Sequence, residues 1–280
     1  MSGVLNIAHR GARSLAPENT LAAARKALQV DADMWELDVA VTADEALIVF
    51  HDDSLARTTD AATRFPDRAP WTFTTFTLAE LGSLDAGSWF VETDPFGEIA
   101  AGAVTPAEQA AYRGEPIPTL QQALTFTKDQ NYGVNVELKR LPPPLERFPI
   151  VERVLALIDA LDVADHLVIS SFVHDWLREI QVRRPQIEVQ ALIGYSETQP
   201  LDWGNLEFKA YNARHTLVSE ARIRELREKG IGVNLWTIDD VDDMRRYITA
   251  GAAGLINDYP HKMAALFHPQ QAPGLLAHKV

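Results

Sequence analysis

The sequence contains no cysteine among its 280 residues. This absence excludes disulfide bonds and thiolate metal ligands, so any metal site must use oxygen or nitrogen ligands. A chain without cysteine also suits a reducing compartment, and we expect a cytoplasmic location.

Long apolar runs and an excess of positive charge are also missing. No apolar segment approaches the ~20 residues of a membrane-spanning helix, so we expect no stable membrane insertion. The first residues show no basic segment followed by a cleavage site, so we expect no signal peptide. The net charge of −13 repels nucleic acid and anionic membrane surfaces, and neither is expected as a partner. An anionic small substrate requires a site with its own positive charge. No pattern in the sequence indicates an oligomeric state.

Short apolar runs alternate with amphipathic segments along the chain, which is 46% hydrophobic and 23% charged. Eight runs are expected as strands: 5–8, 35–39, 134–138, 167–170, 188–192, 207–211, 233–236 and 254–257. Helices are expected at 20–30, 119–129, 150–161, 174–182, 219–229 and 241–250, with another around 196–205. Thr20 and Ser219 are the expected N-caps of two of these helices. This alternation, at a length near ~250 residues, predicts an α/β protein with a single (β/α)8 TIM-barrel domain over residues 1–280.

Two segments do not fit the alternation. Residues from about 56 to 116 are rich in Thr, Pro, Gly and Asp, with aromatic residues scattered among them. A structureless loop of that length is unusual, so we expect a small inserted subdomain after the second strand region. From about 261 to 280 the sequence shows little periodicity and is expected to form a C-terminal tail.

Polar side chains occupy one face of three expected strands. Alternate residues of a strand point to the same side, so the apolar residues of these strands face one way and the polar residues the other. The inward-facing set is Glu36, Asp38, Asn135, Glu137, Lys139, Asn234 and Trp236. Barrel interiors are dominated by branched apolar side chains, so this polar lining indicates a functional site.

Three of these residues are carboxylates: Glu36, Asp38 and Glu137. Facing one space, they repel each other unless a cation binds them or their pKa values rise. Ligands that are all oxygen favour Mg²⁺ or Ca²⁺, which makes these three residues the candidate metal ligands. The alternative is an interior salt-bridge network with Lys139 and Arg10, and spacing alone does not decide between the two.

Two histidines and two cations complete the candidate site. His9 and His51 each follow an apolar strand-like run, as residues at the C-terminal mouth of a barrel do. An imidazole pKa near ~6.5 suits both proton abstraction and proton donation, although a structural role is the alternative. Arg10 offers a planar fork for two phosphate oxygens, and Lys139 offers a point charge.

Nine short segments occur in an order that is typical of one family. They are His9-Arg10-Gly11, Pro17-Glu18-Asn19-Thr20, Glu36-Leu37-Asp38, His51-Asp52 with Arg57-Thr58-Thr59 behind it, Ile117-Pro118-Thr119-Leu120, Val136-Glu137-Leu138-Lys139, Ser171-Phe172, Val233-Asn234-Leu235-Trp236-Thr237 and Asp258-Tyr259-Pro260. With these segments the sequence resembles the glycerophosphodiester phosphodiesterases over nearly its whole length.

The resemblance implies a fold, a reaction and a set of residue roles. It implies hydrolysis of a glycerophosphodiester to sn-glycerol 3-phosphate and an alcohol, with catalysis at the positions of His9 and His51 and metal ligation at those of the three carboxylates. We expect Phe172 and Trp236 to line the pocket for the alcohol. Glu18 and Asn19 are expected to order the loop and hold the residues that contact substrate or metal.

Several alternatives stay open at this point. A lysophospholipase D-like enzyme would use the same site on a longer lipid, and a non-catalytic protein would only bind the phosphodiester. Another metal-dependent barrel enzyme, such as an aldolase, has no evident need for the two histidines. The attacking group is either water or the substrate's own glycerol 2-hydroxyl, which would give a cyclic phosphate.

Overall fold

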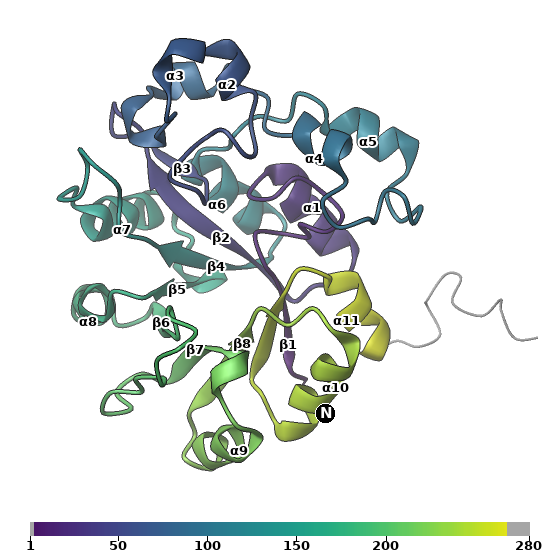
Figure 1. Cartoon of the computed structure of the whole chain (residues 1–280). Coiled ribbons are helices and arrows are strands. Elements are labelled where there is room, and N and C mark those ends of the chain that lie inside the picture. The colour runs from purple at the N-terminus through teal and green to yellow at the C-terminus, as the bar shows by residue number, and fades with distance from the viewer. Residues whose placement is uncertain (1–2, 268–280) are drawn as a thin grey trace, which may run out of the picture.

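Eight parallel strands close into a barrel in the computed structural model, which describes residues 3–267. Neighbouring strands follow the order β1-β9-β8-β7-β6-β5-β4-β2, and β1 also pairs with β2, which closes the ring. The ninth strand, β3, pairs antiparallel with β2 outside the ring. The predicted (β/α)8 TIM barrel is therefore confirmed, and Figure 1 shows its helices arranged around the strands.

The strands match the expected runs closely. They are β1 (Leu5–Ala8), β2 (Met34–Val41), β3 (Leu47–Val49), β4 (Gly133–Leu138), β5 (Leu167–Ser171), β6 (Glu188–Ile193), β7 (Ala210–Arg214), β8 (Gly232–Trp236) and β9 (Gly254–Asn257). The helices that surround the barrel are α1 (Leu21–Gln29), α6 (Leu120–Asp129), α7 (Ile150–Leu161), α8 (His174–Arg183), α9 (Glu220–Glu228), α10 (Val241–Ala250) and α11 (Pro260–Phe267). Among residues 3–267, no helix combines the length and apolar character needed to cross a membrane.

Side-chain caps fix where the outer helices begin. Thr20 accepts a hydrogen bond from the Ala23 amide at the start of α1, and Ser219 accepts one from the Arg222 amide at the start of α9. Each bond satisfies an amide that the first turn leaves without an intrahelical partner. Both predicted N-caps are confirmed.

The core lies between the barrel strands and these helices. Trp35, Leu37 and Val39 on β2 are buried on the face that the strand period predicts. The Trp35 indole donates to Thr127 Oγ1 of α6 at 3.1 Å, so its one polar atom is satisfied inside the apolar layer. With the apolar residues facing the helices, the polar residues of the same strands face the barrel interior.

Three expectations for the outer elements need correction. The sixth ring strand, β7, begins at Ala210 rather than 207. Phe208 lies before the strand and is buried by ring contacts with His174 and Tyr211, not by strand pairing. Residues 196–205 form no helix, and Pro200 and the positive φ of Gly204 explain why. Residues 261–267, assigned to the tail from sequence, belong to α11 (Pro260–Phe267), and residues 268–280 of that tail lie outside the described part.

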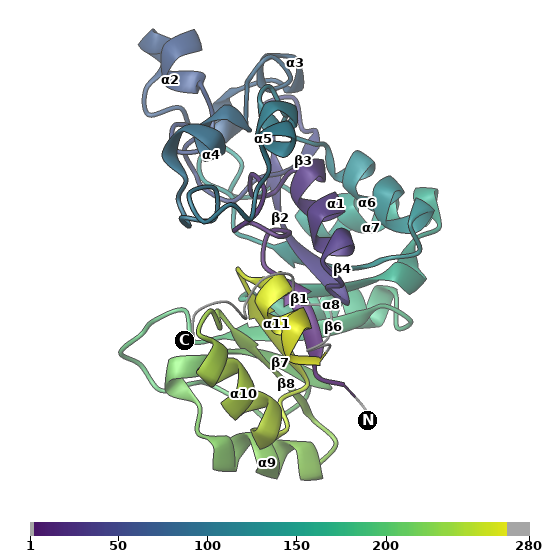
Figure 2. The same cartoon turned by 90° about the vertical axis from the view of Figure 1, so that its right-hand side faces the viewer.

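Residues from about 56 to 116 form short helices and contain no strand of the sheet. They are α2 (Ala61–Arg64), η1 (Pro66–Arg68), η2 (Phe73–Thr75), α3 (Leu78–Leu81), α4 (Ser88–Thr93) and α5 (Pro106–Tyr112). Figures 1 and 2 show α2–α5 together on the side of the barrel that carries β3 and α1. Aromatic rings pack within this segment, for example Phe90 against Tyr112 at 5.9 Å. An ion pair joins the segment to α1 through Glu108 and Lys26.

Candidate active site

One large cavity of about 1170 Å³ opens at the C-terminal mouth of the barrel. All the residues expected to hold metal, phosphate or alcohol, and both histidines, line it: His9, Arg10, Glu36, Asp38, His51, Glu137, Lys139, Phe172 and Trp236. Residues at the C-terminal ends of barrel strands are where barrel enzymes place their chemistry. The two remaining candidates, Glu18 and Asn19, lie behind this lining and contact it.

The three candidate carboxylates meet on adjacent strands. β2 and β4 pair in parallel with Asp38 opposite Glu137, and Glu36 lies one pleat earlier on the same face. One oxygen from each carboxylate lies within 4.8 Å of the others, and Glu36 and Asp38 are only 3% and 2% exposed. Two buried acids and a half-buried one at this spacing offer the oxygen ligands that a hard divalent cation prefers.

The electrostatics of the three carboxylates differ. Burial raises the pKa of Asp38, but Lys139, His51 and Arg10 outweigh it and hold that pKa below its usual value. Burial and the negative charge of Asp38 raise the pKa of Glu36 well above normal and that of Glu137 to about 8. The protein's own cations therefore compensate the negative charge of Asp38 but not that of Glu36 and Glu137. The three carboxylates together can accommodate an added positive ion. Neither Glu36 nor Glu137 forms an ion pair within the described residues, so the alternative of a closed salt-bridge network accounts for Asp38 alone.

An unusual backbone turn brings Arg10 into the cavity. Arg10 has a φ of +54°, and its amide donates to Glu36 Oε2 at 2.8 Å. Gly11 follows with a φ of +78°, where a Cβ atom would lie 2.6 Å from the Ala23 Cβ. Only glycine fits that position, because both the dihedral and the space exclude a side chain. The Arg10 Nε is buried without a hydrogen-bond partner and lies 3.6 Å from Asp38, so the guanidinium retains a donor.

Each candidate histidine is oriented by its own aspartate. His9 Nδ1 lies 2.7 Å from Asp258 Oδ1, and His51 Nδ1 lies 2.7 Å from Asp52 Oδ1. The pKa values of both aspartates are lowered, because the neighbouring cations and hydrogen bonds outweigh the opposing effect of burial. Ionised carboxylates accept a hydrogen bond from Nδ1–H, which keeps the proton on Nδ1 and leaves the lone pair of a neutral ring on Nε2. Burial lowers the pKa of His9 in spite of Asp258, which favours the neutral, basic ring.

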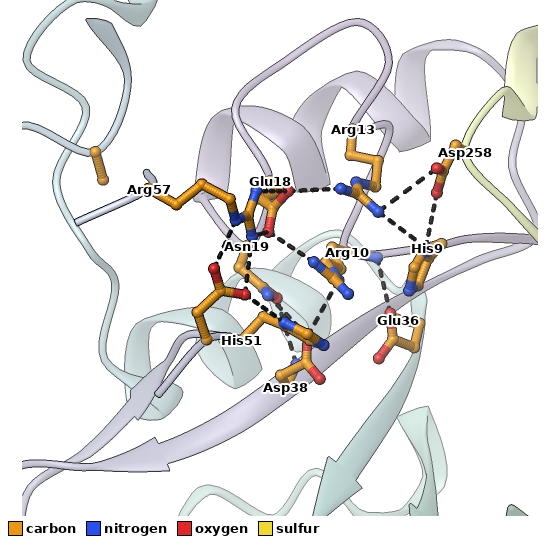
Figure 3. A network of polar contacts seen from close by, with 12 residues as sticks. His9, Arg10, Arg13, Glu18, Asn19, Glu36, Asp38, His51, Arg57 and Asp258 are labelled. Carbon is orange, nitrogen blue, oxygen red and sulfur yellow. Dashed lines mark hydrogen bonds and ion pairs between the residues drawn. The ribbon is translucent and has the colours of Figure 1, made fainter. Parts of the chain in front are cut away.

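Glu18 and Asn19 both contact the residues that line the cavity. Asn19 donates from Nδ2 to Asp38 Oδ2 at 2.9 Å, and its Oδ1 accepts from the Asp38 amide at 3.3 Å. Glu18 accepts hydrogen bonds from Arg10, Arg13 and Arg57, and Figure 3 shows it between these arginines. Burial favours the protonated form of Glu18, but the three arginines outweigh it and lower its pKa.

Lys139 links the carboxylates to the loop that carries the second histidine. Its Nζ lies 3.4 Å from Asp38 Oδ1 and donates to the carbonyl oxygen of His51 at 2.9 Å. The positive charge therefore lies beside the candidate metal ligands and also fixes the backbone at His51.

Aromatic rings form the outer wall of the cavity. Phe172 packs edge-on against Trp236 at 5.8 Å and against Tyr195 at 5.4 Å. The Arg214 guanidinium lies 4.4 Å from the centre of the Trp236 ring. Sequence reasoning found Phe172 and Trp236 but missed Tyr195 and Arg214. Tyr195 lies on the loop after β6, which carries no motif that predicts its path, and Arg214 ends β7, whose position was expected three residues too early.

Sequence reasoning also assigned no role to Arg13 and Arg57. Arg13 follows His9 by four residues and precedes Glu18 by five, and on a loop neither spacing indicates that the side chains are in contact. Arg57 lies 39 residues from Glu18 along the chain. Asp52, in contrast, directly follows His51, and that adjacency is the only local signal for the histidine–aspartate pairs.

A (β/α)8 barrel with a charged cavity at its C-terminal mouth defines this chain as a barrel enzyme. The profile of the glycerophosphoryl diester phosphodiesterase family matches residues 9–262. A glycerophosphodiester phosphodiesterase of Caldanaerobacter subterraneus is 31% identical over 268 residues, which cover 94% of this chain and 97% of the relative. The chain belongs to the glycerophosphoryl diester phosphodiesterase family and is a phosphodiesterase.

Solved structures agree with this assignment. An Oleispira antarctica phosphodiesterase, determined with its product sn-glycerol-3-phosphate, superposes with a TM-score of 0.72 at 27% identity, over 94% of this chain and 96% of that one. A glycerophosphodiester phosphodiesterase from Agrobacterium tumefaciens superposes with a TM-score of 0.67 at 26% identity, over 92% of this chain and 98% of that one.

Proposed function

We propose that this phosphodiesterase hydrolyses glycerophosphodiesters to sn-glycerol 3-phosphate and an alcohol, in a reaction that depends on a divalent cation and two histidines. The observation that carries the proposal is the joint presence, in one cavity, of three clustered carboxylates and two histidine–aspartate pairs. The reaction product bound to the Oleispira antarctica relative supports the choice of substrate.

Glu36, Asp38 and Glu137 are the proposed ligands of the cation. Two of the three have pKa values raised by burial and mutual repulsion, so a bound cation relieves an unfavourable charge arrangement. All-oxygen ligands favour Mg²⁺ or Ca²⁺. When bound, the cation supplies Lewis-acid polarisation of a phosphate oxygen.

The remaining charged residues act on the phosphate and on its protons. Arg10 and Lys139 hold the phosphate and stabilise the negative charge that develops on its oxygens. His9 and His51 divide the proton transfers between them, one taking a proton from the attacking oxygen and the other giving one to the leaving alkoxide. Because Asp258 and Asp52 each fix an Nδ1 proton, Nε2 is the atom on each ring that exchanges protons with substrate.

Phe172 and Trp236 are the proposed walls of the alcohol subsite. Tyr195 extends this wall outward and is 82% exposed. The exposed aromatic rim is the one feature that favours a lysophospholipase D-like activity as the second candidate, because an acyl chain would need an apolar surface at the mouth. A cytoplasmic location, supported by the absence of cysteine, is part of the proposal.

The test is to follow products by phosphorus NMR with glycerophosphocholine, glycerophosphoethanolamine and lysophosphatidylcholine as substrates. The proposal predicts sn-glycerol 3-phosphate from the first two. Turnover of lysophosphatidylcholine alone would favour the second candidate. Absence of any turnover in folded, cation-loaded protein would contradict both and favour a binding role. A transient cyclic phosphate signal identifies attack by the glycerol 2-hydroxyl, and incorporation of solvent oxygen without that signal identifies attack by water.

A further inference from the structure

The two histidines of the site are joined by a continuous chain of ion pairs that passes through one buried glutamate (Figure 3). We propose that Arg57 is a positioning residue of the reaction, which ties the His51–Asp52 pair to Glu18 and, through Glu18, to the His9 side. The inference rests on the proposed function, and it assigns to residues 56–116 a role in orienting a catalytic group.

The first half of the chain runs from His51 to Arg57. Asp52 Oδ1 accepts a hydrogen bond from His51 Nδ1 at 2.7 Å, and the same carboxylate binds the Arg57 fork, with Nε at 2.5 Å and Nη2 at 3.0 Å. A carboxylate held by two guanidinium nitrogens has a fixed plane. The orientation of the His51 ring, which Asp52 binds, therefore depends on Arg57.

The second half runs from His9 to Arg13. His9 Nδ1 binds Asp258 Oδ1, and the other oxygen of Asp258 lies 3.5 Å from Arg13 Nη1. The second terminal nitrogen of Arg13 donates to Glu18 Oε2 at 2.8 Å. From each histidine the contacts thus lead to an aspartate and then to an arginine, and both arginines bind the carboxylate of Glu18.

Glu18 is the point of convergence. Its side chain is 3% exposed, and Arg57 reaches both of its oxygens, Oε1 from Nη2 at 2.6 Å and Oε2 from Nη1 at 3.1 Å. Arg10 donates to Oε1 at 2.8 Å. Glu18 thus binds two arginines from the loop between β1 and α1 and one from the segment after β3, and each of them has little freedom, because a guanidinium that moves away leaves a buried oxygen of Glu18 without that hydrogen bond.

Arg57 enters this network from outside the barrel sheet. It lies at the start of the segment between β3 and α6, and its guanidinium is 5.8 Å from the centre of the Trp89 ring in α4. Trp89 is itself held by a hydrogen bond from its indole nitrogen to the Ala86 carbonyl oxygen at 2.9 Å. The inserted helices therefore support one side of Arg57, while Glu18 and Asp52 bind its other side.

The chemical consequence is a division of roles. Arg57 is 42% exposed as a side chain and does not line the cavity, so it does not contact substrate. A histidine that transfers protons must present the correct nitrogen at the correct angle. Loss of Arg57 frees Asp52 and with it His51. The expected defect is therefore in kcat, with little change in KM.

The test compares Arg57→Ala and Arg57→Lys with Arg113→Ala, a matched control in the same segment. Arg113 is exposed and pairs with Glu92 at 3.1 Å, away from the histidines. For Arg57→Ala we expect kcat to fall about 10- to 100-fold with KM nearly unchanged, as for other residues that orient a catalytic group. Arg57→Lys restores charge without the fork and should recover only part of the rate, while Arg113→Ala should match the wild type.

Two further measurements make the result specific. Because Arg57 is partly exposed, added ethylguanidinium should restore part of the kcat of Arg57→Ala, and added ethylammonium should restore less. Selective ¹⁵N labelling of histidine reports the ring tautomers without any turnover, and the His51 signals should lose their Nδ1–H character in Arg57→Ala while the His9 signals change less. Trp89→Leu should shift the His51 signals in the same direction by a smaller amount.

The outcomes separate this inference from the proposed function. Unchanged kcat and unchanged His51 signals in folded Arg57→Ala overturn the inference and leave the function intact. A raised KM with normal kcat also overturns it, since that result assigns Arg57 to substrate binding. If the wild type hydrolyses no glycerophosphodiester, the proposed function fails, and the tautomer spectra still decide whether Arg57 orients His51. If Arg57→Ala does not fold, Arg57→Lys and Trp89→Leu provide the same comparison.

Discussion

Replacing Glu137 by glutamine is expected to stabilise the cation-free protein at alkaline pH while weakening its binding of a divalent cation. Burial and the charge of Asp38 raise the pKa of Glu137 to about 8. The folded protein therefore keeps a proton on Glu137 that the unfolded chain releases at a pKa of about 4.5. Between these two values unfolding releases a proton, so the stability of the cation-free protein falls as pH rises.

The size of the effect follows from the same two pKa values. The full shift corresponds to an upper bound of about 5 kcal/mol in the free energy of unfolding above pH 8. Because Glu36 competes for the same proton, we expect glutamine at 137 to recover about 2–4 kcal/mol, or about 4–10 °C in Tm. Near pH 5 both glutamate and glutamine are neutral in the folded state, so the difference should nearly vanish.

Thermal unfolding in a chelating buffer, at about pH 5 and about pH 8.5, measures this difference. Glu146→Gln is the matched control, since Glu146 is exposed on the loop before α7. Adding Mg²⁺ or Ca²⁺ at ~100 times its Kd should raise wild-type stability by about 2.7 kcal/mol, and by less in Glu137→Gln. A Glu137→Gln protein that is less stable than the wild type at alkaline pH without cation would refute the reasoning, because it would show that the charge of Glu137 is already compensated.

Three further predictions concern the histidines, the buried glutamate and the inserted helices. His9→Ala and His51→Ala should each lower kcat by about 10²–10⁴-fold in steady-state assays with Tm close to wild type, and near-normal turnover in either would remove that residue from proton transfer. Glu18→Gln should destabilise the protein by about 3–5 kcal/mol at neutral pH, because it leaves three arginines facing a neutral group. Since the folded-state pKa of Glu18 is lowered, its contribution to the free energy of unfolding is present above the unfolded pKa of about 4.5 and is lost as pH falls below it. Chemical denaturation at lower pH should therefore show a smaller difference in the free energy of unfolding between Glu18→Gln and the wild type. Gly87→Ala should cost at least about 2 kcal/mol, because its Cβ would lie 1.8 Å from the Tyr112 carbonyl oxygen, and an unchanged Tm would contradict that contact.

The barrel and the lining of the site could be predicted from the sequence because both depend on local periodicity. Strand alternation alone placed Glu36, Asp38 and Glu137 on one inner face, and the structure brings one oxygen of each within 4.8 Å of the others. The apolar residues of the same strands face the helices, as Trp35 shows by its bond to Thr127.

The contacts that orient the site could not be predicted in the same way. His9 and Asp258 are 249 residues apart, and they meet only because β1 and β9 are neighbours in the closed barrel. Arg57 reaches Glu18 from a segment whose short helices follow no extended pattern. The helix expected around residues 196–205 was wrong because it was inferred from the strand–helix alternation of the barrel, whereas Pro200 and Gly204 prevent a helix there.

The charge arrangement explains why one site requires both acids and arginines. Glu18 and Asp38 are held ionised by neighbouring cations, whereas Glu36 and Glu137 resist ionisation until an external positive charge arrives. Arg10 contacts both of the ionised carboxylates, Glu18 at 2.8 Å and Asp38 at 3.6 Å. The arrangement therefore keeps the proposed phosphate-binding residue Arg10 next to the candidate cation site, where it compensates Asp38 but leaves Glu36 and Glu137 without an ion pair among the described residues.

The most direct test of the central claim is the rate at which chelator-treated protein releases sn-glycerol 3-phosphate from glycerophosphocholine or glycerophosphoethanolamine as Mg²⁺ or Ca²⁺ is added back. We expect no release with chelator, saturable recovery with at least one of the two cations, and a weaker apparent affinity for that cation in Glu137→Gln. Full activity in the presence of chelator, or recovery that is identical in wild type and Glu137→Gln, would contradict it.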